Sequence, residues 1–182
     1  MNILQRISDT LYHGTIDTII SVDVTKGRSN KDFGKGFYMA VERSQAIGIM
    51  NKKFNEAVRR IKSKDPNQFS NNLYEIKLNK NLLPAFKIKY FLDADMEWLD
   101  FILLCRSSKT IPHDYDLVIG ATADDNTALC LKYYFDGIYV KVGSDDAKEL
   151  LMKNLKVENL GIQYYIGKQQ VADKLILSIT EL

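Results

Sequence analysis

Two short stretches near the start of the chain decide the fold: LYHGT at residues 11–15 and DFGKGFYMA at residues 32–40. Each places an aromatic residue beside a glycine near the end of an expected strand. Glycine lets a ligand approach the backbone closely, and the neighbouring imidazole or phenol can hydrogen-bond or stack on that ligand. Either stretch alone is also typical of a tight turn with core aromatic residues. The two together indicate where a binding site is to be sought.

The hydrophobic periodicity around these stretches predicts a mixture of strands and helices. The expected strands are residues 7–13, 37–40, 73–78, 117–120 and 162–166. The expected helices are residues 45–61, 95–105, 125–135, 145–155 and 169–179, with Ser44, the pair Asp124–Asp125 and Ser144 as caps of the first, third and fourth. Strands and helices do not alternate strictly, which favours an α+β fold over a doubly wound sheet.

Length and composition are those of one ordinary domain. The chain has 182 residues, 46% of them hydrophobic, and a net charge of +2. The polar stretch at residues 62–72 is expected to be a loop inside a single domain over residues 1–182. A charge this close to zero neither demands nor excludes a nucleic-acid partner.

Several familiar chemistries are disfavoured by the residues present. The two histidines, His13 and His113, lie far apart and the two cysteines are single, so no four-ligand zinc set is formed and no metal is expected. Spacing alone leaves open a nucleophilic pair of His113 with Cys105 or Cys130. Both cysteines, however, fall in apolar helical runs, and His113 is expected to be an exposed turn residue. The kinase-like text DFG at residues 32–34 lacks the other kinase motifs.

The sequence also bears on location. The opening residues MNILQRISDT have neither the basic region nor the apolar core of a secretion signal. No run approaches the roughly 20 apolar residues of a membrane span. We therefore expect a cytoplasmic protein without a membrane partner.

The motifs resemble the ADP-ribosyltransferase superfamily, in its diphtheria-toxin and poly(ADP-ribose) polymerase branch. There a [YW]HG[ST] strand is followed by FGKGIYF and a helix; here YHGT is followed by FGKGFYMA and by SQA at residues 44–46. The later stretches are similar to an uncharacterised bacterial family of that superfamily. They are WLDFI at residues 98–102, YDLVIG at 115–120, ADD at 123–125 and QYY at 163–165. The resemblance runs from about residue 11 to residue 177 and implies an ADP-ribosyltransferase-like split β-sandwich core with flanking helices.

The same resemblance implies that NAD is the co-substrate and assigns roles to individual residues. Gly14 would present its backbone N–H and C=O to the nicotinamide amide, and His13 would hydrogen-bond the ribose on the adenosine side. Tyr38 would stack on the nicotinamide ring, and Thr15 would lie near that ring. The expected NAD contacts are Tyr12, His13, Gly14, Thr15, Gly36 and Tyr38.

A basic residue near the second motif is expected to neutralise the diphosphate of NAD. The resemblance does not choose among the candidates, which are Lys26, Arg28, Lys31 and Lys35.

The third catalytic position departs from the pattern of the superfamily. Members that build poly(ADP-ribose) place a glutamate on a late strand, where this chain has Gln163. An amide can hydrogen-bond a ribose hydroxyl but cannot take a proton as a carboxylate does. Glu158 could be proposed as a substitute carboxylate, but it precedes the strand and is ranked below Gln163. The expected catalytic set is therefore His13, Tyr38 and Gln163, without chain elongation.

These observations imply a mono-ADP-ribosyltransferase that moves ADP-ribose from NAD to a macromolecular acceptor and releases nicotinamide. The acceptor is a protein or a nucleic acid. Small members of the superfamily are often intracellular bacterial toxins with a cognate antitoxin, so a toxin–antitoxin pair is expected. Two alternatives stay open: a non-catalytic module that binds NAD, ADP-ribose or a protein partner, and an NAD glycohydrolase that uses water as acceptor.

Overall fold

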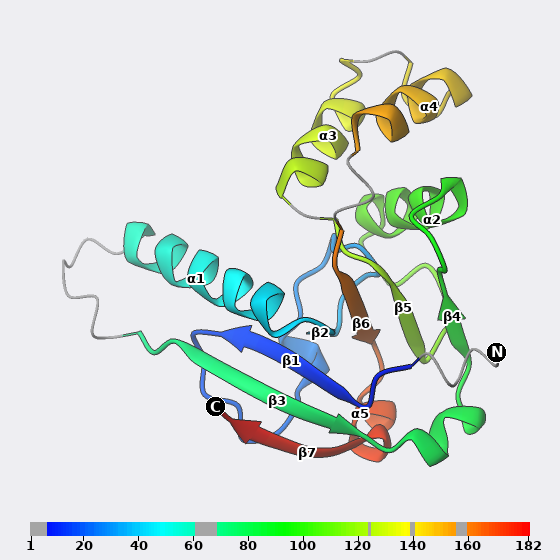
Figure 1. Ribbon diagram of the computed structural model, residues 1–182. Coiled ribbons are helices and arrows are strands. Elements are labelled where there is room, and N and C mark those ends of the chain that lie inside the picture. The colour runs from blue at the N-terminus through cyan, green and yellow to red at the C-terminus, as the bar shows by residue number, and fades with distance from the viewer. Residues whose placement is uncertain (1–6, 61–68, 124, 139–140, 156–159) are drawn as a thin grey trace.

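The computed structural model describes residues 7–60, 69–123, 125–138, 141–155 and 160–182 (Figure 1). Within these ranges the chain forms a mixed α+β fold, as expected. Its strands are β1 Thr10–Thr15, β2 Phe37–Ala40, β3 Asn72–Leu78, β4 Ile88–Tyr90, β5 Leu117–Ala121, β6 Ile162–Ile166 and β7 Ile176–Glu181. Its helices are α1 Arg43–Arg60, α2 Met96–Ser107, α3 Asp125–Phe135, α4 Asp145–Asn154 and α5 Gln169–Leu175, with short 3-10 turns at Val24–Lys26 and Lys80–Ala85.

The strands form one sheet in the order β4-β5-β6-β2-β1-β3-β7. Neighbours are antiparallel except for β4 and β5. The join between β1 and β2 is narrow, because it consists of the single pair Tyr12 and Ala40. Figure 1 shows the strands of the two halves, β4-β5-β6-β2 and β1-β3-β7, running in different directions from this join.

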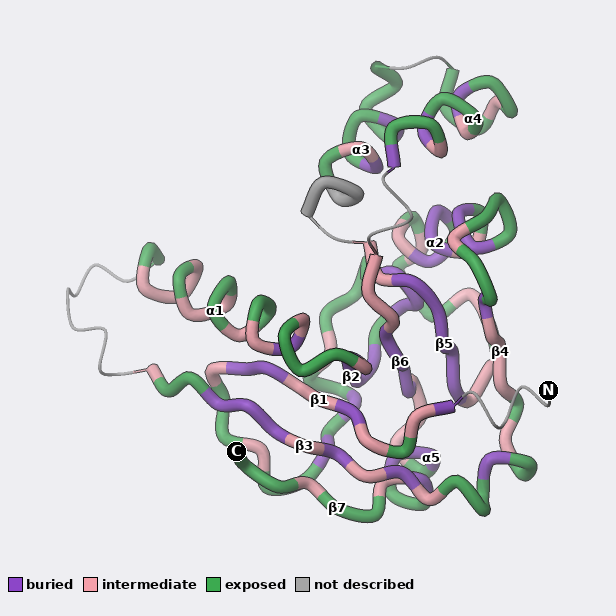
Figure 2. The backbone as a smooth tube through the Cα atoms, in the orientation of Figure 1, coloured by how far each residue is buried: buried purple, intermediate pink, exposed green. Residues whose placement is uncertain are grey.

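Side-chain alternation along β2 and β6 builds two core clusters, one on each face of the sheet. Phe37, Tyr164 and Ile166 point to the face that α5 covers. Tyr38 and Tyr165 point to the other face, where α2 and α4 pack. Figure 2 shows that β5 is buried along its whole length between these layers. None of the helices in the described ranges has the length and apolar character needed to cross a membrane.

Helix α1 lies beside β1 (Figure 1), and its contacts with the sheet run from Ala46 to Lys53. The expected cap at Ser44 is wrong, because the helix already begins at Arg43 and the carbonyl of Glu42 accepts from the N–H groups of Gln45 and Ala46. Ala46 is the one residue of α1 that is buried. It packs on Gly14 of β1, where a Cβ atom would lie 1.9 Å from the Ala46 carbonyl oxygen.

The expected closing helix over residues 169–179 is also wrong in its second half. Helix α5 ends at Leu175, and residues 176–181 form β7, which pairs with β3 through Ile76 and Ile179. The apolar stripe fits either a helix or a strand. The strand prevails because β3 needs a partner along its outer edge and because residues 176–181 are rich in β-branched side chains. The short strand β4 was not expected either.

The other expected elements are confirmed. The bounds of β2, α3 and β6 are those predicted, and those of β1, β3, β5, α2 and α4 differ by a few residues at most. Ser144 caps α4 by accepting from the N–H of Ala147. Residues 61–68 of the expected loop, the proposed cap Asp124 and Glu158 lie outside the described residues.

The close contact of Gly14 with α1 can be tested by stability. Gly14→Ala is expected to lower the free energy of unfolding by about 1–3 kcal/mol, because the added methyl group meets backbone that cannot turn away. Gly48→Ala in α1 is the matched control, since nothing lies within 4 Å of the added Cβ. It is expected to raise the free energy by about 0.5–1 kcal/mol. Urea unfolding measures both, and similar effects of the two changes would contradict the packing argument.

Candidate functional site

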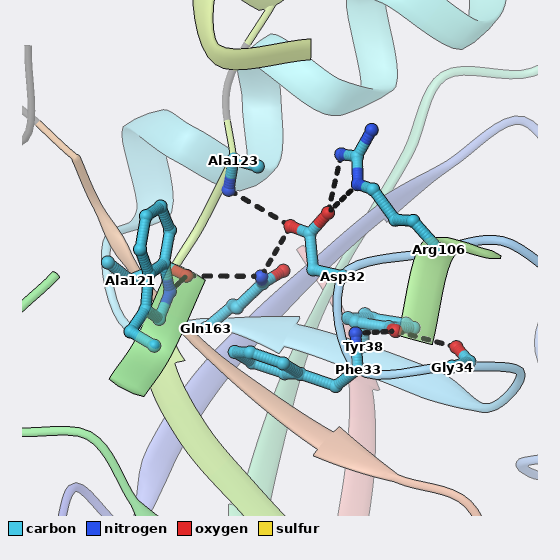
Figure 3. Close-up of polar contacts among 9 residues, drawn as sticks. Asp32, Phe33, Gly34, Tyr38, Arg106, Ala121, Ala123 and Gln163 are labelled. Carbon is cyan, nitrogen blue, oxygen red and sulfur yellow. Dashed lines mark hydrogen bonds and ion pairs between the residues drawn. The ribbon is translucent and has the colours of Figure 1, made fainter. Parts of the chain in front are cut away.

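The best-defined polar cluster is centred on the buried carboxylate of Asp32, which is 6% exposed (Figure 3). Its Oδ1 accepts from Nε and Nη2 of Arg106, at 3.0 and 2.5 Å. Its Oδ2 accepts from the backbone N–H of Ala123 at 2.9 Å and from Nε2 of Gln163 at 2.8 Å. Four donors therefore surround one carboxylate, and the position of Asp32 is set from three separate parts of the chain.

Gln163 lies in this cluster with its side-chain nitrogen turned inward. Besides Asp32, Nε2 lies 3.4 Å from the carbonyl oxygen of Ala121. Both partners are acceptors, so the nitrogen and not the oxygen of the amide must face them. Among the described residues, both hydrogen bonds of the Gln163 side chain are donated by this nitrogen. The amide oxygen is the atom left to accept a hydrogen bond from a ligand.

Neighbouring groups fix both the hydroxyl and the ring of Tyr38. Its hydroxyl donates to the carbonyl of Gly34 at 2.6 Å and accepts from the N–H of Phe33 at 3.0 Å. Its ring packs 5.2 Å from the ring of Tyr165. Burial, and then the negative charge of Asp32, raise the pKa of Tyr38 well above its usual value. The phenol is therefore neutral and fixed, which suits a stacking surface better than an acid or base.

His13 approaches the same segment from β1. Its Nδ1 lies 2.6 Å from the carbonyl oxygen of Tyr38, and its ring stacks on Phe37 with 4.6 Å between centroids. Burial, with the nearby charge of Lys53, lowers the pKa of His13 to about 4. Because a carbonyl oxygen only accepts, Nδ1 carries the proton of the neutral ring. Nε2 is therefore the nitrogen that can accept from a ligand hydroxyl.

Gly14, the next residue of β1, has its carbonyl engaged by a lysine. Nζ of Lys53 in α1 donates to this oxygen at 3.0 Å. Burial lowers the pKa of Lys53, as do Lys31 and Arg28, while Asp17 opposes the shift. Cations thus gather where Gly14 was expected to meet nicotinamide.

The four candidate diphosphate ligands separate into two groups. Arg28 and Lys31 belong to the neighbourhood of Lys53, whereas Lys26 and Lys35 act on the exposed carboxylate of Asp23. Only the first group acts on Lys53, the lysine that binds the Gly14 carbonyl.

The remaining expected NAD contacts have structural roles in the sheet. The Thr15 hydroxyl exchanges hydrogen bonds with Asp17. Tyr12 packs beside Ala46 at the join of the two half-sheets. A Cβ at Gly36 would lie 2.4 Å from the carbonyl oxygen of Ile166, so close packing on β6 already requires glycine there.

The register of the sheet decides which site residues share a face. Ala40 pairs with Gln163 and Tyr38 with Tyr165, so Tyr38 and Gln163 project from the same face of β2 and β6. Tyr12 pairs with Ala40, and His13 therefore points to the opposite face at the join. His13 reaches β2 through the Tyr38 backbone. Within the described ranges no hydrogen bond joins Gln163 directly to His13 or Tyr38.

Comparison with known proteins gives a family. A family model described as a protein of unknown function, DUF3990, matches residues 10–177. The chain belongs to the DUF3990 family. No curated protein and no solved structure matches it. The matched range begins with β1 and includes His13, Asp32, Tyr38 and Gln163. The DUF3990 description names no activity.

Three residues of this DUF3990 site were not expected from sequence: Asp32, Arg106 and Lys53. Asp32 lay in the text dismissed as kinase-like, and Arg106 closes an apolar helix. No local pattern links either to Gln163. Lys53 did carry a signal, because it continues the 46–50–53 face of α1 that packs on β1.

A second histidine of the DUF3990 chain also departs from expectation. His113 is half-buried rather than exposed, and its Nε2 donates to the carbonyl of Phe33 at 2.9 Å. It lies among the rings of Phe101, Tyr115 and Tyr165. The contact supports the loop that carries Asp32. Among the described residues no group of three His, Cys, Asp or Glu side chains is arranged to hold a metal ion.

The lowered pKa of His13 predicts a dependence of stability on pH. The unfolded chain protonates His13 near the ordinary pKa of 6.5, whereas the pKa of His13 in the folded protein is about 4. The contribution of His13 to the free energy of unfolding is therefore complete above pH 6.5 and is lost as pH falls toward 4. The difference in free energy of unfolding between wild type and His13→Gln should shrink by roughly 3 kcal/mol from pH 7 to pH 4. Urea unfolding at both pH values measures it. A constant difference would mean that His13 titrates normally.

Proposed function

We propose that this protein is an NAD-dependent mono-ADP-ribosyltransferase that acts on a macromolecular acceptor. The observation that carries the proposal is the meeting of three distant positions at one segment of β2. His13 from β1 contacts the Tyr38 backbone, and Gln163 from β6 shares a face with the Tyr38 side chain. His13 and Tyr38 lie in the motifs that resemble the superfamily, and Gln163 stands where chain-building members place a glutamate. The narrow join of the two half-sheets supports the finer expectation of a split β-sandwich.

The site offers the kinds of group that an extended dinucleotide needs. The Tyr38 ring is a fixed, neutral surface for the nicotinamide ring. His13 is neutral and offers Nε2 to a ribose hydroxyl. Arg28 and Lys31 are favoured for the diphosphate over Lys26 and Lys35, because their charges act on Lys53, which binds Gly14. NAD would bind across the join, with parts on both half-sheets.

In the proposed reaction the bond between the ribose and the nicotinamide nitrogen breaks, and nicotinamide leaves with the electron pair. A bond then forms between the ribose carbon and a nucleophilic atom of the acceptor. The transition state has oxocarbenium character, as in glycoside hydrolysis. The Gln163 oxygen would accept from a ribose hydroxyl and bring partial negative charge close to the developing cation.

The acceptor's proton has no base in this cluster. Asp32 is the nearest carboxylate to Gln163, and four donors already occupy it. The acceptor must therefore be nucleophilic at neutral pH or bring its own base. This supports single transfer over chain elongation, since a ribose hydroxyl needs a base to act as nucleophile.

A non-catalytic binding module is the second candidate, and one contact favours it. Lys53 occupies the Gly14 carbonyl that was expected to hold nicotinamide. The expectations of a toxin–antitoxin pair and of a glycohydrolase rest on sequence resemblance alone.

The proposal is tested by incubating the purified protein with labelled NAD and a bacterial lysate, following macromolecular label and free nicotinamide together. Tyr38→Ala and His13→Ala are expected to lower both by about 100-fold, because the reacting groups lose their placement. Tyr38→Phe is the matched control. It keeps the stacking ring but loses the two hydroxyl contacts that fix it, and should retain more label than Tyr38→Ala.

The outcomes separate the candidates. Loss of label on protease or nuclease treatment identifies the acceptor as protein or nucleic acid. Nicotinamide release without label identifies a glycohydrolase, and NAD binding without release identifies a binding module. If label persists after both alanine changes, the site assignment is wrong. If calorimetry detects no binding of NAD to the wild type, the proposed function is overturned.

A further inference from the structure

We infer that Asp32 is a positioning residue, whose carboxylate holds the side-chain amide of Gln163 in one orientation. The nitrogen is turned toward Asp32, and the oxygen is the atom that remains to meet a ligand. The orientation itself stands on the contacts of the cluster. Its consequence for a bound ribose rests on the proposed function.

The argument begins with the partners of Asp32, all of which are donors. The Arg106 guanidinium and the backbone N–H of Ala123 cannot accept a hydrogen bond. A reversed Gln163 amide would place its oxygen against the carboxylate and against the carbonyl of Ala121, both of them acceptors. In a cluster where Asp32 is 6% and Gln163 is 7% exposed, water cannot relieve that contact. One orientation of the amide is therefore strongly preferred.

The loop that carries Asp32 acts on Tyr38 as well. Asp32 binds Gln163, and the next two residues, Phe33 and Gly34, bind the Tyr38 hydroxyl through their backbone (Figure 3). Arg106 at the end of α2 anchors this loop through two hydrogen bonds to Asp32. Three consecutive residues thus place Gln163 and Tyr38, which project from the same face of β2 and β6.

Asp32→Asn is the sharpest single change, because it alters one oxygen to nitrogen at constant shape. The new amide keeps its oxygen toward the charged Arg106 and places its NH₂ group where Oδ2 was. That group faces two donors, the Ala123 N–H and Gln163 Nε2, so the Gln163 amide is expected to turn over. The site then presents NH₂, whose partial positive charge opposes an oxocarbenium ion. Nicotinamide release should fall by about 10- to 100-fold in kcat, with a smaller change in KM.

Gln163→Glu alone is expected not to create an active site, although chain-building members of the superfamily have glutamate at this position. The introduced carboxylate would lie where Nε2 is, 2.8 Å from Oδ2 of Asp32. Two carboxylates this close share a proton. The folded pair keeps a proton that the unfolded chain has already released, so the stability of this variant falls as pH rises from 5 to 8.

The double variant Asp32→Asn with Gln163→Glu exchanges the amide and the carboxylate. The introduced asparagine can donate to the introduced glutamate and keep its oxygen for Arg106. The rescue is partial, because the Ala123 N–H loses its acceptor and the Ala121 carbonyl faces an oxygen at about the present 3.4 Å. A carboxylate then titrates in the site, so kcat should gain an acidic limb that wild type lacks.

The experiment compares wild type, the two single variants and the double variant by urea unfolding at pH 5 and pH 8, and by nicotinamide release across the same range. The double variant is expected to unfold at higher urea than the sum of the single effects predicts. Of the four proteins, only the Gln163→Glu variant should lose stability from pH 5 to pH 8 through the proton shared by two carboxylates. Asp116→Asn is the matched control, since Asp116 also pairs with a cation, Lys168, at 2.6 Å. When Asp116→Asn is combined with Gln163→Glu, the change in the free energy of unfolding should equal the sum of the two single changes.

Each outcome decides a distinct point. If the effects of Asp32→Asn and Gln163→Glu simply add, Asp32 does not orient the amide and the inference is wrong. If wild type releases nicotinamide but Asp32→Asn keeps its kcat, the orientation has no part in the reaction and the positioning role is overturned. If wild type neither binds NAD nor releases nicotinamide, the proposed function fails, and the urea cycle alone then judges the orientation.

Discussion

The structure depends on a join one residue pair wide. β1 and β2 share only the pair of Tyr12 and Ala40, yet every strand of each half-sheet is connected to the other half through it. Immediately beside the join, α1 lies against β1 so closely that Gly14 leaves no room for a side chain. The residues expected to bind NAD lie on both sides of this join because the strands separate there.

A second constraint is the burial of Asp32. A carboxylate removed from water must be surrounded by donors, and this one draws them from α2, from the end of β5 and from β6. Satisfying it fixes the loop at residues 32–34, and that loop in turn fixes Tyr38. The contacts that compensate the burial of Asp32 are thus also the contacts that position Gln163 and, through the loop, Tyr38. A chain with a less buried acid here would need another means of holding both side chains.

The local sequence pattern predicted the elements whose ends are clearly marked. It failed where the same apolar spacing fits both a helix and a strand. β2 follows a glycine turn and β6 lies between Gly161 and Gly167, and both have the predicted bounds. The stripe of residues 171–179 satisfies a helix and a strand alike, and only the unpaired edge of β3 decides between them. Of the site, the motif residues could be named from sequence. The contacts of Asp32 could not be predicted, because Arg106 and Gln163 lie 74 and 131 positions away from it and no periodic signal links them to it.

The hydrogen bond from Lys53 to Gly14 has a consequence for how any ligand is recognised there. A ligand that donates to the Gly14 carbonyl from the direction of Lys53 does not meet an unsatisfied oxygen. It replaces an ammonium group, which must then find another partner. The exchange leaves the number of hydrogen bonds unchanged, so this contact adds little to affinity. Its value is selective: the displaced ammonium is best accommodated when the incoming molecule carries its own anionic group within reach. If NAD is the ligand, as proposed, nicotinamide by itself would bind less well at this point than the intact dinucleotide.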